Sequence, residues 1–304
     1  MHTITLSAES SDEGSRIDRF LSEKLSNLTR SYLQKLLKED QILINGQSEK
    51  PNYRLKRGDF IEISIPEQQE PKILPENIPL DILYEDEDLL VVNKPKNMVV
   101  HPAAGHYEHT LVNALMYHCR GSLSGINGVL RPGIVHRIDK DTTGALVICK
   151  NDAAHQSLAG QLAVHSITCR YRAIVHGTFQ EESFTVEGDI GRHPTDRKKM
   201  AMHVKNGKHA VTHVKVLKSL RGFSYIECEL ETGRTHQIRV HLSSIGHPIL
   251  GDPLYGPKKC PIPKLHGQTL HAMVLGFLHP GTGDYMEFTA PLPEYFEKLL
   301  QILV

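Results

Sequence analysis

The sequence lacks the features that would place it in a membrane or in an oxidising compartment. None of its apolar runs is long enough to span a bilayer, and residues 1–5 lack the basic and apolar regions of a signal peptide. Its five cysteines are scattered and form no Cys-x-x-Cys pair, which disfavours zinc sites and disulfide frameworks. We therefore expect a cytoplasmic protein with reduced thiols, no metal and no membrane partner.

The chain also lacks net charge, with 35 basic and 35 acidic residues. This balance at first disfavours a nucleic-acid partner, but the average conceals a division. Residues 16–66 carry ten Lys/Arg against seven Asp/Glu, whereas residues 67–88 carry eight acidic residues and one lysine. Because phosphates are bound by local patches, charge alone neither identifies nor excludes an RNA-binding protein.

Length and composition predict two globular domains. At 304 residues the chain exceeds one typical domain, and 39% hydrophobic residues suffice for a substantial core. Four prolines and several glutamates between Pro66 and Pro79 are typical of a linker. We expect domains at 1–66 and 80–304, joined by a linker at 67–79.

The N-terminal segment predicts a small α/β domain. An amphipathic helix is expected to begin at Arg16, and Thr29 can cap a second one. Asn45-Gly46 is a strong hairpin-turn dipeptide, and the alternating isoleucines of residues 61–65 indicate a strand.

The larger segment predicts an α+β domain with a mixed, mainly antiparallel sheet, because strands outnumber helices and no regular βαβ alternation is present. The expected strands are 89–95, 168–175, 226–230 and 285–289, and the expected helices are 151–165, 235–245 and one beginning near Pro293.

The most informative stretch is residues 133–150. Two apolar runs, 134–135 and 145–149, indicate buried strands joined by a polar turn that contains Arg137 and Asp139. Polar groups at the rim of rigid strands are well placed to serve as a catalytic site.

Residues 136–144, His-Arg-Ile-Asp-Lys-Asp-Thr-Thr-Gly, resemble the signature of the RluA-type pseudouridine synthases. Further blocks of that family are matched in the same order from about residue 80 onward, at residues 101–105, 171–177, 231–242, 251–256 and 270–272. The resemblance implies isomerisation of uridine to pseudouridine in RNA, without a cofactor. Residues 191–195 and 207–213 look most like the RluD branch, which modifies a large-subunit ribosomal RNA hairpin loop at the subunit interface.

The resemblance also implies roles for residues of the catalytic domain. Asp139 matches the catalytic aspartate, which either attacks the sugar's anomeric carbon or takes a proton from the sugar. Arg234 is expected to pair with it and stabilise its charge. Tyr171 is expected to stack on the uracil, with Ile238 packed beneath it.

Two residues of the same turn are expected to act on the RNA. Arg137 matches the arginine that enters the space left by the extruded base, where a guanidinium can stack and contact phosphate simultaneously. His136 is expected to shape the turn rather than to transfer protons.

The N-terminal pattern of two helices and a small sheet resembles the alpha-L RNA-binding domain, first known from a small-subunit ribosomal protein. The resemblance implies that its basic residues contact RNA phosphates: Arg16, Arg19, Arg30, Lys35 and Lys38. The expected partner is large-subunit ribosomal RNA, free or within pre-ribosomal particles, bound by a monomer.

Three alternatives stay open at this stage. Asp139-x-Asp141-x-Thr143 also fits the nucleophile loop of haloacid-dehalogenase-type phosphatases, although Gly144 and the missing second acidic pair disfavour it. A second is a non-catalytic ribosome-assembly factor. A third is a synthase of the same family that modifies other ribosomal or transfer RNA uridines.

Overall fold

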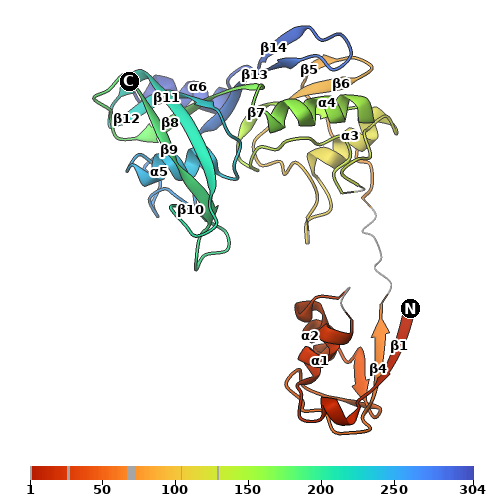
Figure 1. The fold of residues 1–304 in the computed structure, drawn as a ribbon. Coiled ribbons are helices and arrows are strands. Elements are labelled where there is room, and N and C mark those ends of the chain that lie inside the picture. Colours follow the sequence, from red (N-terminus) through yellow and green to blue (C-terminus); the bar gives the residue numbers. More distant parts are fainter. Residues whose placement is uncertain (1, 26–27, 67–72, 104, 129) are drawn as a thin grey trace. The chain divides into compact units, whose positions relative to one another are not determined.

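The computed structural model describes residues 2–25, 28–66, 73–103, 105–128 and 130–304, and the chain divides into two compact units, Met1–Pro71 and Lys72–Val304. Figure 1 shows both units as ribbons coloured by sequence. Part of the expected linker, residues 67–72, lies outside the described residues. The rest of it belongs to the second unit: Ile73 is buried in that unit's core, and the Glu76 amide donates to the Asn113 carbonyl.

The first unit packs two helices against a small antiparallel sheet. The helices are α1 (Ile17–Lys24) and α2 (Arg30–Lys38), and the sheet order is β1 (His2–Ser7), β4 (Phe60–Ile65), β2 (Ile42–Ile44), β3 (Gln47–Ser48). The Thr29 hydroxyl caps α2 by accepting a hydrogen bond from the Tyr32 amide. Apolar side chains of α1, α2, β2 and β4 form one core.

The second unit is built on one large, mainly antiparallel sheet. Its strands run in the spatial order β10 (Met200–Met202), β9 (Ser183–Arg192), β11 (Lys208–Leu220), β12 (Phe223–Leu230), β8 (Thr168–His176), β13 (Leu270–Leu278), β7 (Thr143–Cys149), β6 (Leu89–Lys94), β5 (Ile82–Glu85), with β14 (Tyr285–Thr289) paired to β13. The pair β7–β13 is parallel. This is the α+β fold with a mixed, mainly antiparallel sheet that the sequence predicts.

The helices of this unit are α3 (Leu111–Cys119), α4 (Asp152–Ala163), α5 (Gln237–Ser244) and α6 (Glu294–Ile302). Strand β7 is buried on both faces: Leu146 and Ile148 share a core with α3, while Ala145 and Val147 share one with α4. Helix α5 packs against β9, β10 and β11 (Figure 1). The strand that carries Thr143 is therefore held rigidly on both sides.

One expected strand is absent from the described structure. Ile134 makes only an isolated bridge with Ile148, so residues 134–135 are not a strand, and the polar turn is not a hairpin. Instead, the Cys149 amide donates to the Gly133 carbonyl at 2.9 Å, and irregular chain leads to β7. Gly144 has φ 112°, and a Cβ there would overlap the Ala272 carbonyl, so only glycine allows β7 to approach β13 this closely.

Candidate active site

Asp139 lies in the wall of a cavity of about 630 Å³ within the second unit. The turn before β7 (135–139 and Thr142) and residues 230–239, between β12 and α5, form much of its lining. Cys169 and Tyr171 of β8, Leu270 of β13, and residues 162–167 at and after the end of α4 contribute the rest. The Asp139 side chain is 18% exposed, so water and ligands can still reach it. The site therefore places a reachable carboxylate in the wall of this cavity.

A buried arginine joins Asp139 to a second carboxylate. Nη1 of Arg239 donates to Oδ2 of Asp139 at 2.7 Å, while Nε and Nη2 donate to the two oxygens of Asp252 at 2.7 and 3.0 Å. Burial by itself would lower the pKa of Arg239, but the hydrogen bonds and charges of Asp252 and Asp139 outweigh it and raise that pKa. Arg239 therefore stays protonated and stabilises the negative charge of Asp139.

The expectation that Arg234 pairs with Asp139 is wrong. Arg234 lies before the first turn of α5, and its Nε donates to the His209 carbonyl at 2.9 Å. Arg239, five residues later in the same sequence block, is inside the helix and reaches Asp139 instead. Arg234 still lines the cavity. Both Arg239 and Asp252 belong to blocks that match the family, but block order alone does not reveal which residues pair.

A hydrogen-bonded series approaches Asp139 from its other side. The Met200 amide donates to the Tyr255 hydroxyl at 2.8 Å, and that hydroxyl bonds Nδ1 of His236 at 2.8 Å. When Tyr255 donates to Nδ1, the remaining proton of a neutral His236 is on Nε2, 3.7 Å from Asp139. His236 itself has the left-handed φ of 56°. Neither His236 nor Tyr255 has a role that the sequence motifs predict.

Lys94 holds the turn that carries Asp139. Its side chain is fully buried, and Nζ donates to three backbone carbonyls, those of Pro95, Met98 and Lys140. Burial lowers the pKa of Lys94 to about 7, although the negative charges of Asp141 and Asp139 act to raise it. Because Lys140 separates the two aspartates, this contact fixes the backbone between them.

His136 supports the same turn as a neutral side chain. Its Nε2 accepts a hydrogen bond from the Val147 amide at 3.1 Å, and burial lowers its pKa to about 4. Arg137 is exposed at the cavity, and it makes no ion pair or side-chain hydrogen bond with any residue that the structure describes. The guanidinium of Arg137 is thus available to a ligand.

Tyr171 and Ile238 belong to one apolar cluster, and both line the cavity. Tyr171 pairs with Cys228 and Ala272 in the sheet, and burial, followed by the charges of Cys169 and Asp139, raises its phenol pKa. The phenol is therefore uncharged at neutral pH, and its ring position is fixed by two neighbouring strands.

The basic residues of the first unit differ in whether their side chains already pair with acidic residues of the protein. Asp18 is fully buried and accepts hydrogen bonds from Arg16, Arg30 and Gln34. Arg19 pairs with Glu23, and Lys35 lies 3.8 Å from Glu39. Lys38 is exposed at the end of α2. The expected RNA contacts of Arg16 and Arg30 must therefore coexist with their shared ion pair to Asp18.

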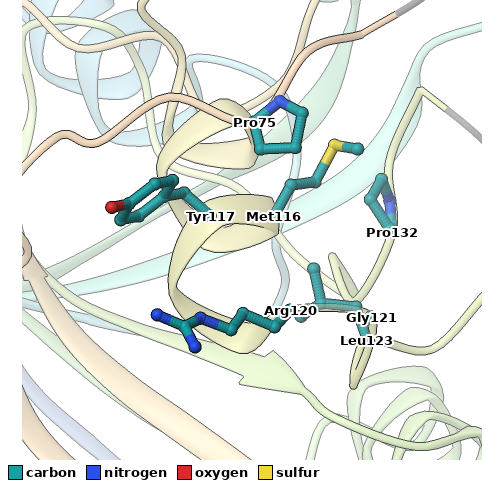
Figure 2. A pocket seen from close by; sticks show the side chains of 7 residues that line it. All are labelled: Pro75, Met116, Tyr117, Arg120, Gly121, Leu123 and Pro132. Atoms are coloured by element: carbon teal, nitrogen blue, oxygen red, sulfur yellow. The ribbon is translucent and has the colours of Figure 1, made fainter.

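A second hollow of about 520 Å³ lies beside α3 (Figure 2). Apolar side chains of Pro75, Met116, Leu123 and Pro132 line it, and Arg120 supplies the charge. Figure 2 shows Tyr117 and Arg120 extending from the helix at the edge of this hollow. Since no carboxylate lines it, this hollow lacks the group that the candidate reaction needs.

Two absences hold for the residues that the structure describes. No cluster of three or more His, Cys, Asp or Glu side chains in these ranges is arranged to hold a metal ion. Likewise, no helix in them combines the length and apolarity that crossing a membrane requires.

Comparison with known proteins identifies the family. The RNA pseudouridylate synthase family matches residues 88–244, and the S4 domain matches residues 15–61. An uncharacterised RNA pseudouridine synthase of Bacillus subtilis, YlyB, is 50% identical over 303 residues, covering 100% of this chain and 99% of that protein. Ribosomal large subunit pseudouridine synthase D of Zymomonas mobilis is 48% identical, covering 96% of this chain and 94% of the relative.

Structural comparison agrees. The human RNA pseudouridylate synthase domain containing 1 protein matches with a TM-score of 0.57 and 28% identity, over 77% of this chain and 97% of that one. The resemblance drawn from the motifs is confirmed: the chain is an RNA pseudouridine synthase and belongs to the RNA pseudouridylate synthase family, with an N-terminal S4 domain.

Proposed function

We propose that this synthase isomerises specific uridines of large-subunit ribosomal RNA, with Asp139 as the catalytic carboxylate. The observation that carries the proposal is the Asp139–Arg239 ion pair, which holds a stabilised carboxylate in the wall of an accessible cavity. The substrate class is supported by relatives named ribosomal large subunit pseudouridine synthase D, at 41–48% identity over nearly the whole chain.

The reaction breaks the bond between uracil N1 and the ribose C1′, rotates the base and joins C5 to C1′. Nothing is oxidised and no group is imported, so the chemistry needs a positioned carboxylate rather than a redox cofactor. In either route open to Asp139, attack on C1′ or removal of a sugar proton, the carboxylate must be ionised. Arg239 supplies the compensating charge, while Asp252 fixes the guanidinium from behind.

The target nucleotide must leave its stack to reach Asp139, and this costs a few kcal/mol. Arg137 is two residues from Asp139, exposed at the same cavity and free of an ion pair among the described residues. In this proposal its guanidinium fills the space left by the base. The uracil then stacks on Tyr171, whose ring is supported by Ile238.

The resemblance to the RluD branch directs the proposal to the hairpin loop at the ribosomal subunit interface. The S4 domain increases the local concentration of RNA near the catalytic unit, with Arg19, Lys35 and Lys38 as exposed cations on α1 and α2. Arg16 and Arg30 contribute through the faces that Asp18 leaves exposed.

Mapping pseudouridines across ribosomal RNA tests the substrate. RNA from cells with the gene, without it, and complemented with Asp139→Asn is compared at single-nucleotide resolution. The proposal expects pseudouridines in large-subunit RNA that disappear without the gene and stay absent with Asp139→Asn. Unchanged large-subunit RNA together with lost pseudouridines in transfer RNA would reject the ribosomal target.

A further inference from the structure

One segment of the catalytic unit is strongly basic although the whole chain has no net charge. Residues 192–208, here called the basic segment, contain six Lys/Arg and a single acidic residue, Asp196. The six are Arg192, Arg197, Lys198, Lys199, Lys205 and Lys208, of which Lys199 is half-buried and the others are exposed. No role for these six residues follows from the family match at residues 88–244 or from the sequence motifs.

The charges of this segment are not neutralised within the protein. None of the six side chains makes an ion pair with a residue that the structure describes. Asp196 uses Oδ1 to accept the Lys198 amide, and Arg192 donates to the Arg197 carbonyl. The adjacent β9 carries two acidic residues, Glu187 and Asp189, and Glu187 lies 3.7 Å from His209 rather than beside one of the six cations. A clear excess of positive charge therefore faces solvent.

The segment has a defined shape, so its cations have fixed positions. Its first turn is closed by the His193 amide bonding the Lys199 carbonyl, and the His193 ring accepts the amides of Thr195 and Asp196. Strand β10 then pairs with β9. These bonds use backbone groups and His193, so substitution of the lysine and arginine side chains leaves them in place.

The basic segment is also attached to the wall of the catalytic cavity. Strand β10 lies beside α5 (Figure 1), and its Met200 amide is bonded to Tyr255, which bonds His236 next to Asp139. Just beyond the segment, the His209 carbonyl accepts a hydrogen bond from Arg234 of the cavity. A molecule bound along this segment would therefore lie beside the cavity that holds Asp139.

We propose that the basic segment binds the phosphate backbone of the substrate RNA next to the target uridine. The inference rests on the proposed function and adds a second RNA-binding surface, separate from the S4 domain. Lysine and arginine without an apolar patch suit phosphate rather than a protein partner, and such contacts position the RNA without reading its bases. Because each contact releases counterions, the contribution of the segment must depend on salt.

The test compares two triple variants that remove equal charge. Arg197→Ala/Lys198→Ala/Lys199→Ala removes three cations of the basic segment. The control, Lys215→Ala/Lys218→Ala/Arg221→Ala, removes three from the far end of β11 and the turn after it. Thermal unfolding of both full-length variants checks that the fold is retained. Affinity for in vitro transcribed large-subunit ribosomal RNA is then measured across a salt series.

The segment variant should lower the slope of log Kd against log salt by about 2–3 and weaken binding at low salt by roughly tenfold or more. The control should leave the slope unchanged. At saturating RNA, kcat of the segment variant should stay within about twofold while KM rises, since only binding is lost. Equal slopes for both variants would overturn the inference.

The two proposals fail differently. If the wild-type protein forms no pseudouridine in large-subunit RNA, the proposed substrate is wrong. If it forms pseudouridine but the two triple variants share one slope and one KM, only the role of the basic segment is wrong.

Discussion

Arg239 and Asp139 are 100 residues apart in the chain, and their side chains meet at 2.7 Å. Arg239 is only 4% exposed and binds a second carboxylate, Asp252, which is fully buried. This arrangement orients the guanidinium toward Asp139 and leaves it little freedom to turn away. The compensating charge that the proposed role of Asp139 requires is thus built into the protein core.

Arg239→Ala should be strongly destabilising, because it leaves Asp252 buried without its partner. Breaking a buried ion pair costs about 3–5 kcal/mol. Arg234→Ala is the matched control: its guanidinium bonds one backbone carbonyl and should lose less than about 1 kcal/mol. Thermal or urea unfolding of both variants measures the difference. Equal losses would contradict the assignment of Arg239 as the partner of Asp139.

Lys94→Met should disturb the turn that carries Asp139. Methionine fills a similar volume but offers no donor to the carbonyls of Pro95, Met98 and Lys140. We expect a loss of stability on the order of 2 kcal/mol and a lower kcat, because the backbone beside Asp139 is released.

Lys96→Met provides the comparison for Lys94→Met, since among the described residues Lys96 donates to one carbonyl, that of Gly267, and lies over the Tyr295 ring. The prediction fails if the two methionine variants lose stability and kcat to the same extent.

The sequence predicted the elements that depend on local signals. The cap at Thr29, the strand at 285–289 and the helix after Pro293 all follow from short-range patterns, and the structure contains them. It did not predict β1, whose partner β4 lies almost sixty residues away. The expected strand at 134–135 failed because hydrogen bonds from Cys149 and Val147 hold that stretch as an irregular turn.

In the candidate site, too, features that depend on local sequence could be predicted, whereas features that depend on tertiary contacts could not. His136, Arg137 and Asp139 could be named as candidates from the motif, because one contiguous block contains them. The pairing partner of Asp139 could not be predicted from the motif. The choice between Arg234 and Arg239 depends on where α5 begins and on which side of α5 faces the cavity. Likewise, the burial of Asp18 between Arg16 and Arg30 is a tertiary contact between two helices.

Asp18 should make the first unit sensitive to acid. Burial would raise its pKa, but hydrogen bonds from Arg16, Gln34 and Arg30 lower it from 3.8 to about 2. A carboxyl group whose pKa is lower in the folded state than in the unfolded chain stabilises the folded state. This stabilisation is fully present at pH values above the pKa of the unfolded chain. Its contribution of about 2 kcal/mol is lost as the pH falls from 3.8 through 2.

Hydrogen exchange of the α1 and α2 amides in the full-length protein measures this contribution. Asp18→Asn should lower protection at pH 6, and the difference from wild type should shrink toward pH 2. Glu13→Gln, which alters an exposed carboxylate nearby, should change protection at neither pH. A difference between Asp18→Asn and wild type that is independent of pH would refute the assignment.

Arg137→Ala should impair turnover on folded RNA far more than on an unstructured oligonucleotide, because only the folded substrate must have a base extruded. Arg131→Ala removes another exposed arginine of the same region and should affect both substrates alike. Single-turnover rates of each variant and of wild type are measured on both RNAs, and the loss of rate on folded RNA is divided by the loss on the unstructured oligonucleotide. A similar loss on both substrates for Arg137→Ala would refute the role of this side chain in base flipping.

The most direct test of the account is tritium release from large-subunit ribosomal RNA labelled at uridine C5, because that hydrogen leaves when C5 bonds to C1′. Wild type is compared with Asp139→Asn and with Asp141→Asn, the neighbouring carboxylate of the same turn, which does not contact Arg239. The account predicts release with wild type and with Asp141→Asn, and none above background with Asp139→Asn. Release by Asp139→Asn at the wild-type rate would contradict it.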